Sequence, residues 1–173
     1  APISPYGFHK LMCEQLAAEF HQIYGLPTTI VRIFSAYGAG LKKQVLWDIC
    51  RKASSQKILR LQGTGNESRD FIHGSDVAQG IYLLIEKSRC VGDIYNLASG
   101  TETSIRELQE IIVGELGMKT KVEFDDLVAP GNPLNWRADI TRLLGMGFTP
   151  KVGLKEGVGS FVRWYLAEGI ASG

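Results

Sequence analysis

A tyrosine and a lysine that could form an acid/base pair lie near the start of the chain, in Tyr6-Gly7-Phe8-His9-Lys10. Residues four apart on a helix share one face and lie about one turn from each other. A cationic amine beside a phenol stabilises the phenolate, so such a tyrosine can exchange a proton with a sugar or alcohol oxygen. The pair alone also fits an ordinary exposed helix face. If it is catalytic it needs a redox cofactor, and since only five residues precede it, we expect the chain to be the C-terminal portion of an enzyme.

A second candidate for chemistry is Arg69, in Arg69-Asp70-Phe71-Ile72-His73. A planar guanidinium binds phosphate oxygens in a bidentate manner, which makes Arg69 a candidate phosphate ligand. The alternative from the sequence is a surface ion pair with Asp70 or Glu67. We expect His73 to be structural.

The tyrosine and lysine require a helix to position them. Ser4 is a suitable N-cap and Pro5 a suitable first helical residue, while Gly25 and then Pro27 end the helix after about Tyr24. An apolar stripe at helical spacing follows this helix, and its members are Phe8, Leu11, Met12, Leu16, Phe20 and Ile23. This stripe predicts packing, either within the chain or against a second copy.

The next segment, Thr28 to Phe34, is β-branched and mostly apolar, which predicts a strand covered on both faces in a parallel sheet. The chain then enters a loop at 35–40. In open α/β sheets, ligands bind just beyond the carboxyl ends of the strands, so this loop is a candidate binding segment.

Helices and strands alternate along the rest of the chain, which predicts an α/β fold. We expect helices at 44–55, 75–87, 104–117, 140–144 and 154–167, and strands at 58–61, 71–73, 93–98 and 121–124. A capping box, Ser104 with Glu107, marks the start of one of these helices. Val77, Ile81, Leu84 and Ile85 are expected on the buried side of the 75–87 helix.

The composition limits the function classes. The 173 residues carry a net charge of +1 with 45% hydrophobic and 21% charged residues, which is typical of a globular domain and argues against nucleic-acid binding. No apolar run approaches the length that spans a bilayer. Cys13, Cys50 and Cys90 show no metal-ligand spacing, so no metal is expected, and their odd, sparse count suits a reducing, cytoplasmic compartment. None of the 20 glycines forms a dinucleotide-binding or P-loop turn.

Taken together, the segments resemble the NAD-dependent epimerase/dehydratase family, the extended short-chain dehydrogenases that act on nucleotide sugars. Pro5-Tyr6-Gly7 with Lys10 resembles the active-site helix of that family. Four further stretches are similar to family segments in the expected order: 32–40, 65–77, 95–108 and 144–157. The resemblance covers nearly the whole chain and implies the C-terminal half of such a protein.

The resemblance implies roles for individual residues. Tyr6 is the catalytic base, and Lys10 binds the nicotinamide ribose beside it. Phe34 lies near the nicotinamide, Ser35 contacts the substrate where relatives usually have Asn, and Arg69 binds the diphosphate. Relatives carry a second phosphate-binding arginine before a Pro-Gly-Asp segment; the matching stretch, 127–133, has none, and Arg137 is a candidate substitute.

The implied fold is the C-terminal part of a Rossmann-like parallel sheet plus a small α/β substrate-binding subdomain. Residues 1–40 would end the NAD-binding domain, and 41–173 would mainly bind the nucleotide-diphosphate sugar, with some segments returning to the sheet. The expected cofactor is NAD, with NADP left open, and the expected assembly is a homodimer through the 6–24 helix. Epimerase, dehydratase and reductase chemistry all stay open, with epimerase (an isomerase) preferred. The alternative is a non-catalytic nucleotide-sugar-binding or dimerisation module.

Overall fold

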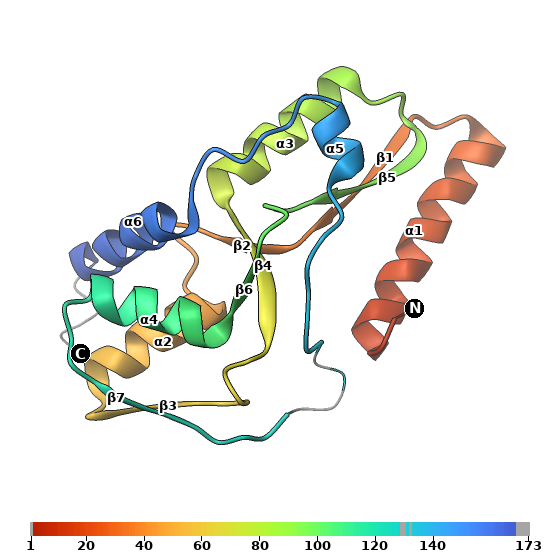
Figure 1. Cartoon of the computed structure of the whole chain (residues 1–173). Helices are drawn as coiled ribbons and strands as arrows, with labels where there is room; N and C mark the ends of the chain where they lie inside the picture. The colour runs from red at the N-terminus through yellow and green to blue at the C-terminus, as the bar shows by residue number, and fades with distance from the viewer. Residues whose placement is uncertain (1, 129–130, 132, 169–173) are drawn as a thin grey trace.

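The computed structural model describes residues 2–128, 131 and 133–168, and its elements alternate between helix and strand (Figure 1). In chain order they are α1 (Pro5–Tyr24), β1 (Thr28–Ile33), β2 (Ser35–Tyr37), α2 (Gln44–Ser55), β3 (Ile58–Leu61), β4 (Ser68–His73), α3 (Gly74–Lys87), β5 (Val91–Leu97), β6 (Glu102–Ser104), α4 (Ile105–Glu115), β7 (Lys121–Phe124), α5 (Thr141–Gly145) and α6 (Leu154–Ala167). The predicted α/β class is confirmed.

Helix α1 begins and ends as its sequence predicts. The Ser4 hydroxyl accepts a hydrogen bond from the Gly7 backbone N–H at 3.2 Å, with Pro5 in the first turn. Gly25 ends the helix with φ of 65°, a conformation that glycine adopts without steric cost. No residue of α1 is buried, and its apolar stripe is open to solvent at Phe8, Met12, Leu16, Phe20 and Ile23.

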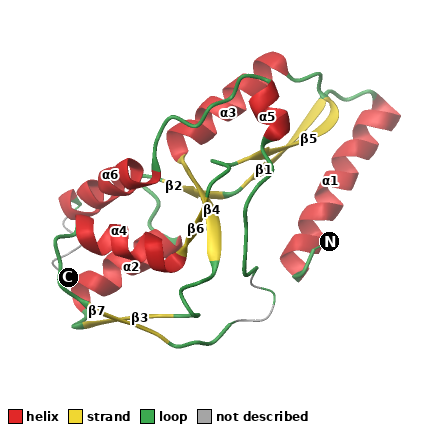
Figure 2. Cartoon of the chain, viewed as in Figure 1, coloured by secondary structure: helices red, strands yellow, loops and turns green. Residues whose placement is uncertain are grey.

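The strands pair mainly in parallel (Figure 2). β1 pairs with β5, and β3 pairs with β7. β4 lies between β2, which is parallel to it, and β6, which is antiparallel. The residues of β1 are half-buried or exposed, so the expected cover on both faces is not present within the described chain.

Two larger apolar clusters hold these elements together. One gathers α2, α4 and α6 over β3 and is centred on fully buried Ile49, Leu108, Phe161 and Tyr165. The other packs α3 and α5 against β4 and β5 through Ile72, Leu84, Leu97 and Leu143. Helix α1 belongs to neither cluster and lies beside β1 and β5 (Figure 1).

No helix in the described ranges is both long and apolar enough to cross a membrane.

Candidate functional site

The tyrosine and lysine of α1 do lie together on one face of the helix. The Lys10 Nζ atom is 5.4 Å from the centroid of the Tyr6 ring, and Tyr6 is 69% exposed. The Ser4 cap and Pro5 fix the first turn that carries the tyrosine. The phenol and the ammonium are therefore accessible to a ligand from the same side.

Phe34 lies at the carboxyl end of β1, where ligands of parallel sheets bind. Its backbone N–H donates to the Leu97 carbonyl at 3.1 Å, which joins it to the end of β5. Its ring is half-buried against Ala98, Ala138 and Ile140. Phe34 is thereby fixed at the edge shared by β1 and β5.

Ser35 and Arg69 line one cavity of about 750 Å³, although 34 positions separate them in the sequence. The pairing of β2 with β4 brings them together, since Ser35 lies opposite Phe71. The N-terminal part of α2 and the segments around Gln62 and Asp125 complete the cavity wall.

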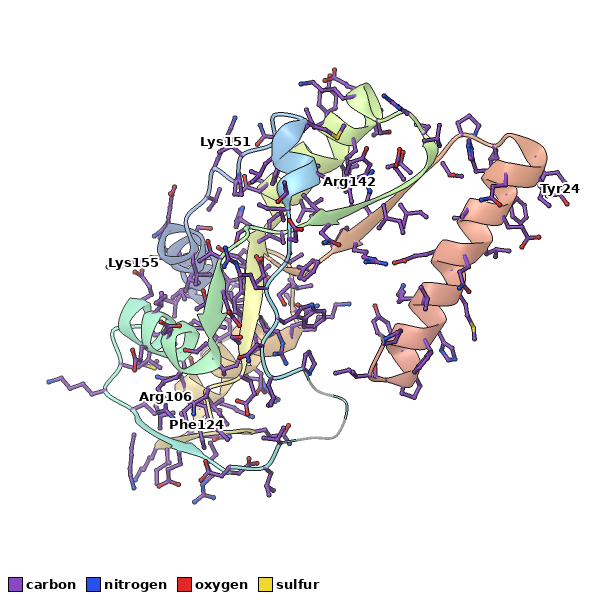
Figure 3. The ribbon with its side chains drawn as sticks, turned by 45° about the vertical axis from the view of Figure 1, so that its right-hand side comes forward. Tyr24, Arg106, Phe124, Arg142, Lys151 and Lys155 are labelled. Atoms are coloured by element: carbon purple, nitrogen blue, oxygen red, sulfur yellow. The ribbon has the colours of Figure 1, made fainter. Side chains whose placement is uncertain are left out.

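The 63–65 turn in the cavity wall is held by close packing and by hydrogen bonds. Gly65 has φ of +82°, and a Cβ atom there would lie 2.7 Å from the Phe124 ring, so only glycine fits. Arg106 of α4 lies over the same ring at 4.6 Å and donates to the Thr64 carbonyl at 2.9 Å (Figure 3).

Glu67 is a buried carboxylate that is hydrogen-bonded to the same turn. It accepts hydrogen bonds from the backbone N–H groups of Thr64 and Gly65, each at 3.0 Å. Burial opposes ionisation, but these hydrogen bonds outweigh it and hold the pKa of Glu67 below its ordinary value. Backbone N–H groups of the turn beside Arg69 therefore donate to the Glu67 carboxylate.

Arg69 is held in a fixed orientation at the cavity wall. Its Nη1 donates to the carbonyls of Ser68 and Pro133 at 2.6 and 2.8 Å, and its guanidinium lies 5.5 Å from the centroid of the Trp136 ring. Burial lowers the pKa of Arg69, and the negative charge of Glu67 opposes that shift.

The two carboxylates considered as surface partners of Arg69 are engaged elsewhere. Asp70 is fully buried and accepts from the Ser99 N–H and hydroxyl, the Gly100 N–H and the Ala138 N–H, at 2.7 to 3.2 Å. Glu67 accepts from its own turn. Arg69 is thus a half-buried cation that lines a cavity.

Arg137 lies away from this cavity. Its Nε donates to the Gly100 carbonyl at 2.9 Å, and it lines a second hollow of about 560 Å³ with Thr141 and Pro150. Its suggested role as a substitute phosphate ligand gains no support from this position. In the 127–133 stretch, residues 129, 130 and 132 lie outside the described residues.

Trp136, which the sequence analysis did not identify, is a neighbour of two candidate site residues. It contacts Arg69, and its ring centroid lies 5.7 Å from that of Phe34. It belongs to an irregular segment between β7 and α5, where no periodicity marks a side chain as inward or outward. Its only sequence signal is a lone tryptophan between a Pro/Gly-rich stretch and Arg137.

The same segment also reaches α1. A Cβ atom on Gly131 would lie 3.4 Å from the Ile3 carbonyl oxygen, next to the Ser4 cap. The segment between β7 and α5 therefore runs between the start of α1 and β4 (Figure 1).

The donor set fits one end of a nicotinamide dinucleotide. A phenol and an ammonium exposed on one face suit ribose hydroxyls, and half-buried Phe34 at the strand end offers an apolar contact for a flat ring. The chain has no glycine-rich turn for the dinucleotide phosphates. Within the described ranges, no group of three or more His, Cys, Asp or Glu side chains could hold a metal ion.

Comparison with known proteins defines the class of this chain. Residues 1–98 match the family described as NAD dependent epimerase/dehydratase. The chain therefore belongs to this family, and the family resemblance inferred from the sequence is confirmed.

Individual relatives agree with this assignment. The chain is 31% identical to an uncharacterized UDP-glucose epimerase, YtcB, of Bacillus subtilis, over 91% of this chain and 50% of that protein. It is 30% identical to a UDP-glucuronate 4-epimerase of Thermodesulfobacterium geofontis, over 94% of this chain and 50% of the relative. The chain thus spans about half the length of these relatives.

Solved structures share the fold. A UDP-glucuronic acid 4-epimerase from Bacillus cereus, in complex with UDP-glucuronic acid and NAD, superposes with a TM-score of 0.89 at 25% identity, over 97% of this chain and 54% of that one. A UDP-N-acetylglucosamine 4-epimerase from Methanobrevibacter ruminantium gives 0.86 at 28% identity, over 97% and 55%. The Rossmann-like α/β fold class is confirmed, and the family is NAD-dependent, as expected.

Proposed function

We propose that this chain is the C-terminal portion of an NAD-dependent nucleotide-sugar epimerase or dehydratase. The observation that carries the proposal is the shared cavity of Ser35 and Arg69, which places a hydroxyl just after the end of β1 and a cation near the start of β4 beside one cavity, in a chain of this family. A cavity of about 750 Å³ has the size of a small-molecule site.

Tyr6 and Lys10 form the acid/base pair. The Tyr6 phenolate takes a proton from a sugar hydroxyl and later returns it, while Lys10 stabilises the phenolate and would donate to the nicotinamide ribose. When bound, NAD supplies reversible oxidation of the sugar carbon. Phe34 would contact the nicotinamide, and its half-buried ring just beyond the end of β1 supports this assignment.

Arg69 binds the diphosphate of the nucleotide sugar, and Ser35 contacts the substrate. The carbonyls of Ser68 and Pro133 and the Trp136 ring hold the guanidinium at the cavity wall, so little rotamer entropy is lost on binding. Among the possible reactions we favour epimerisation, and the relatives named UDP-glucose epimerase and UDP-glucuronate 4-epimerase support that choice.

The proposed division of the chain places residues 1–40 in the NAD-binding domain and 41–173 mainly in the nucleotide-sugar-binding region. The pairing of β5 with β1 supports the return of a later segment to the first sheet. The alignment with half of each relative supports a longer protein.

Without a dinucleotide turn, the 173 residues alone are expected to show no NAD-dependent turnover. A cytoplasmic location agrees with the three free cysteines.

The proposal is tested in the complete enzyme with two substitutions. Tyr6→Phe removes the proton-transferring hydroxyl and should lower kcat about 10²- to 10⁴-fold while nucleotide-sugar binding persists. Arg69→Ala should chiefly weaken nucleotide-sugar binding, measured by calorimetry.

Tyr24→Phe is the matched control, because Tyr24 lies at the far, exposed end of the same helix (Figure 3). It should leave both kcat and binding unchanged. A Tyr6→Phe enzyme that keeps most of its rate would remove Tyr6 from the mechanism. Unchanged affinity in Arg69→Ala would remove Arg69 from the binding site.

The second candidate function is a non-catalytic nucleotide-sugar-binding or dimerisation module. The open apolar stripe of α1 favours the dimerisation part, because Phe8, Met12 and Leu16 are each more than half exposed. We propose that this helix forms the homodimer contact. Turnover in the complete enzyme, abolished by Tyr6→Phe, would rule out the non-catalytic alternative.

A further inference from the structure

Trp136 joins the two ends of the candidate site. Its ring contacts Phe34 on one side, with centroids 5.7 Å apart and planes inclined by 57°. The guanidinium of Arg69 lies 5.5 Å from the same ring. Trp136 is still 41% exposed, so part of its surface is open beside these two residues.

The position of Trp136 is fixed by hydrogen bonds of the backbone around it. The carbonyls of Pro133 and Leu134 accept from Arg69 and from the Ser68 N–H. The Trp136 backbone N–H donates to the Ser68 hydroxyl at 3.4 Å, and the Ala138 backbone N–H donates to the buried Asp70 carboxylate at 3.2 Å. These four hydrogen bonds fix the backbone of the segment beside β4, and the contacts with Phe34 and Arg69 hold the Trp136 ring.

The order of contacts gives Trp136 a role, provided that the proposed function holds. In a nucleotide sugar, the sugar ring is joined to the diphosphate, and the carbon to be oxidised must reach the nicotinamide. The ring therefore lies between the diphosphate ligand Arg69 and the nicotinamide neighbour Phe34. We propose that Trp136 forms the wall of the subsite for the sugar ring and helps to determine which sugars bind.

The side chain suits this ligand. A pyranose presents C–H groups on its faces and hydroxyls at its edge, and an aromatic ring covers such an apolar face while the indole N–H can donate to a hydroxyl. An aromatic wall with a few polar groups is the usual lining of a small-molecule site. Substitution of Trp136 should therefore affect the sugar and leave the nucleoside diphosphate unaffected.

The test uses calorimetry on the complete protein to compare each nucleotide sugar with its free diphosphate: UDP-glucose with UDP, and dTDP-glucose with dTDP. Trp136→Ala should weaken binding of the nucleotide sugar about five- to tenfold and change binding of the free diphosphate by less than about twofold. Trp136→Phe should restore most of the loss. Leu134→Ala, an exposed side chain of the same segment, is the matched control and should change neither.

The outcomes separate this inference from the proposed function. Equal weakening of both ligands by Trp136→Ala would mean that Trp136 acts only through Arg69, which overturns the inference and leaves the proposed function standing. No weakening of either ligand would also overturn it. If the unaltered protein binds neither the nucleotide sugars nor the diphosphates, the proposed function fails and the sugar subsite with it.

Discussion

Tyr37 carries a buried hydroxyl that has no hydrogen-bond partner among the described residues. Burial, with the charges of Asp76 and Glu156 as smaller causes, raises its pKa to about 12, so it is neutral at physiological pH. Gly157 of α6 packs directly against this hydroxyl, and a Cβ atom on Gly157 would collide with it. The two residues form a close contact between β2 and α6.

This contact predicts an unusual result for a glycine within a helix. Gly157→Ala should lower the free energy of unfolding by about 1–3 kcal/mol through overpacking, although alanine is the better helix former. Tyr37→Phe should be neutral or stabilising, because it removes an unsatisfied buried group. The double variant should recover part of the loss. Urea unfolding measures all three.

Gly114 of α4 provides the control, because a Cβ atom there would meet nothing within 4 Å. Gly114→Ala should stabilise the protein by about 0.5–1 kcal/mol. If Gly157→Ala behaved in the same way, the close contact with Tyr37 would be refuted.

At the scale of single residues, the sequence predicted the positions of candidate residues where a strong local rule applied. The four-residue spacing predicted that Tyr6 and Lys10 share a face, and the strand-end rule marked Ser35. No local rule applied to Trp136, because its position depends on hydrogen bonds to β4, which lies more than 60 residues earlier in the chain.

At the scale of elements, the sequence was most reliable where caps were explicit. The limits of α1 and the capping box of α4 are as predicted. β2 and β6 were not predicted, because three-residue strands have too little pattern and depend on pairing with distant β4. The first turn of α3 is capped by the His73 side chain, which accepts from the Ser75 N–H, while the Asp76 carboxylate is buried and accepts from the N–H groups of Lys151 and Val152.

The buried face of α3 was predicted only in part. Leu84 is buried as expected, but Ile81 and Ile85 are 37% and 73% exposed, and Gly80 lies against Leu97 instead. The close approach of the helix backbone to β5 at Gly80 rotates the two isoleucines outward. A hydrophobicity pattern does not show where a helix needs a small residue so that its backbone can approach a strand.

The attachment of α1 to the sheet is expected to depend on pH. Glu14 of α1 accepts two hydrogen bonds from Arg32 of β1, at 2.6 and 2.5 Å, and the bonds hold the pKa of Glu14 below its ordinary value. A lowered folded-state pKa means that this stabilisation is present above about pH 4.5 and is lost as pH falls through the lowered pKa. The pair is partly exposed, so its contribution is below about 1 kcal/mol.

Hydrogen exchange of α1, corrected for intrinsic rates, should therefore show faster opening as pH falls below about 4.5. Glu14→Gln should open faster at neutral pH and lose the dependence. Glu19→Gln, on the same helix and exposed, should retain it. A Glu14→Gln profile that matches the unaltered protein would show that this ion pair does not hold the helix.

At the scale of the whole molecule, the main feature is an amphipathic helix whose apolar stripe faces solvent. We expect the chain to self-associate at high concentration through α1. Leu16→Glu, at a side chain 53% exposed, should prevent association while changing the free energy of unfolding by less than about 0.5 kcal/mol. Sedimentation velocity measures the association; Gln15→Glu, an exposed position on the same helix, is the control. A strictly monomeric unaltered protein would refute this expectation.

The parallel pairing of the strands has a consequence for the order of folding. Ile33 pairs with Leu97 and Leu61 with Phe124, so each of these strands must wait for a partner made about 60 residues later. At ribosomal rates of about 5–20 residues per second, that interval is roughly 3–12 s. Such non-local pairing folds slowly and leaves strand edges open meanwhile, so we expect the nascent chain to need chaperone protection until β5 and then β7 emerge.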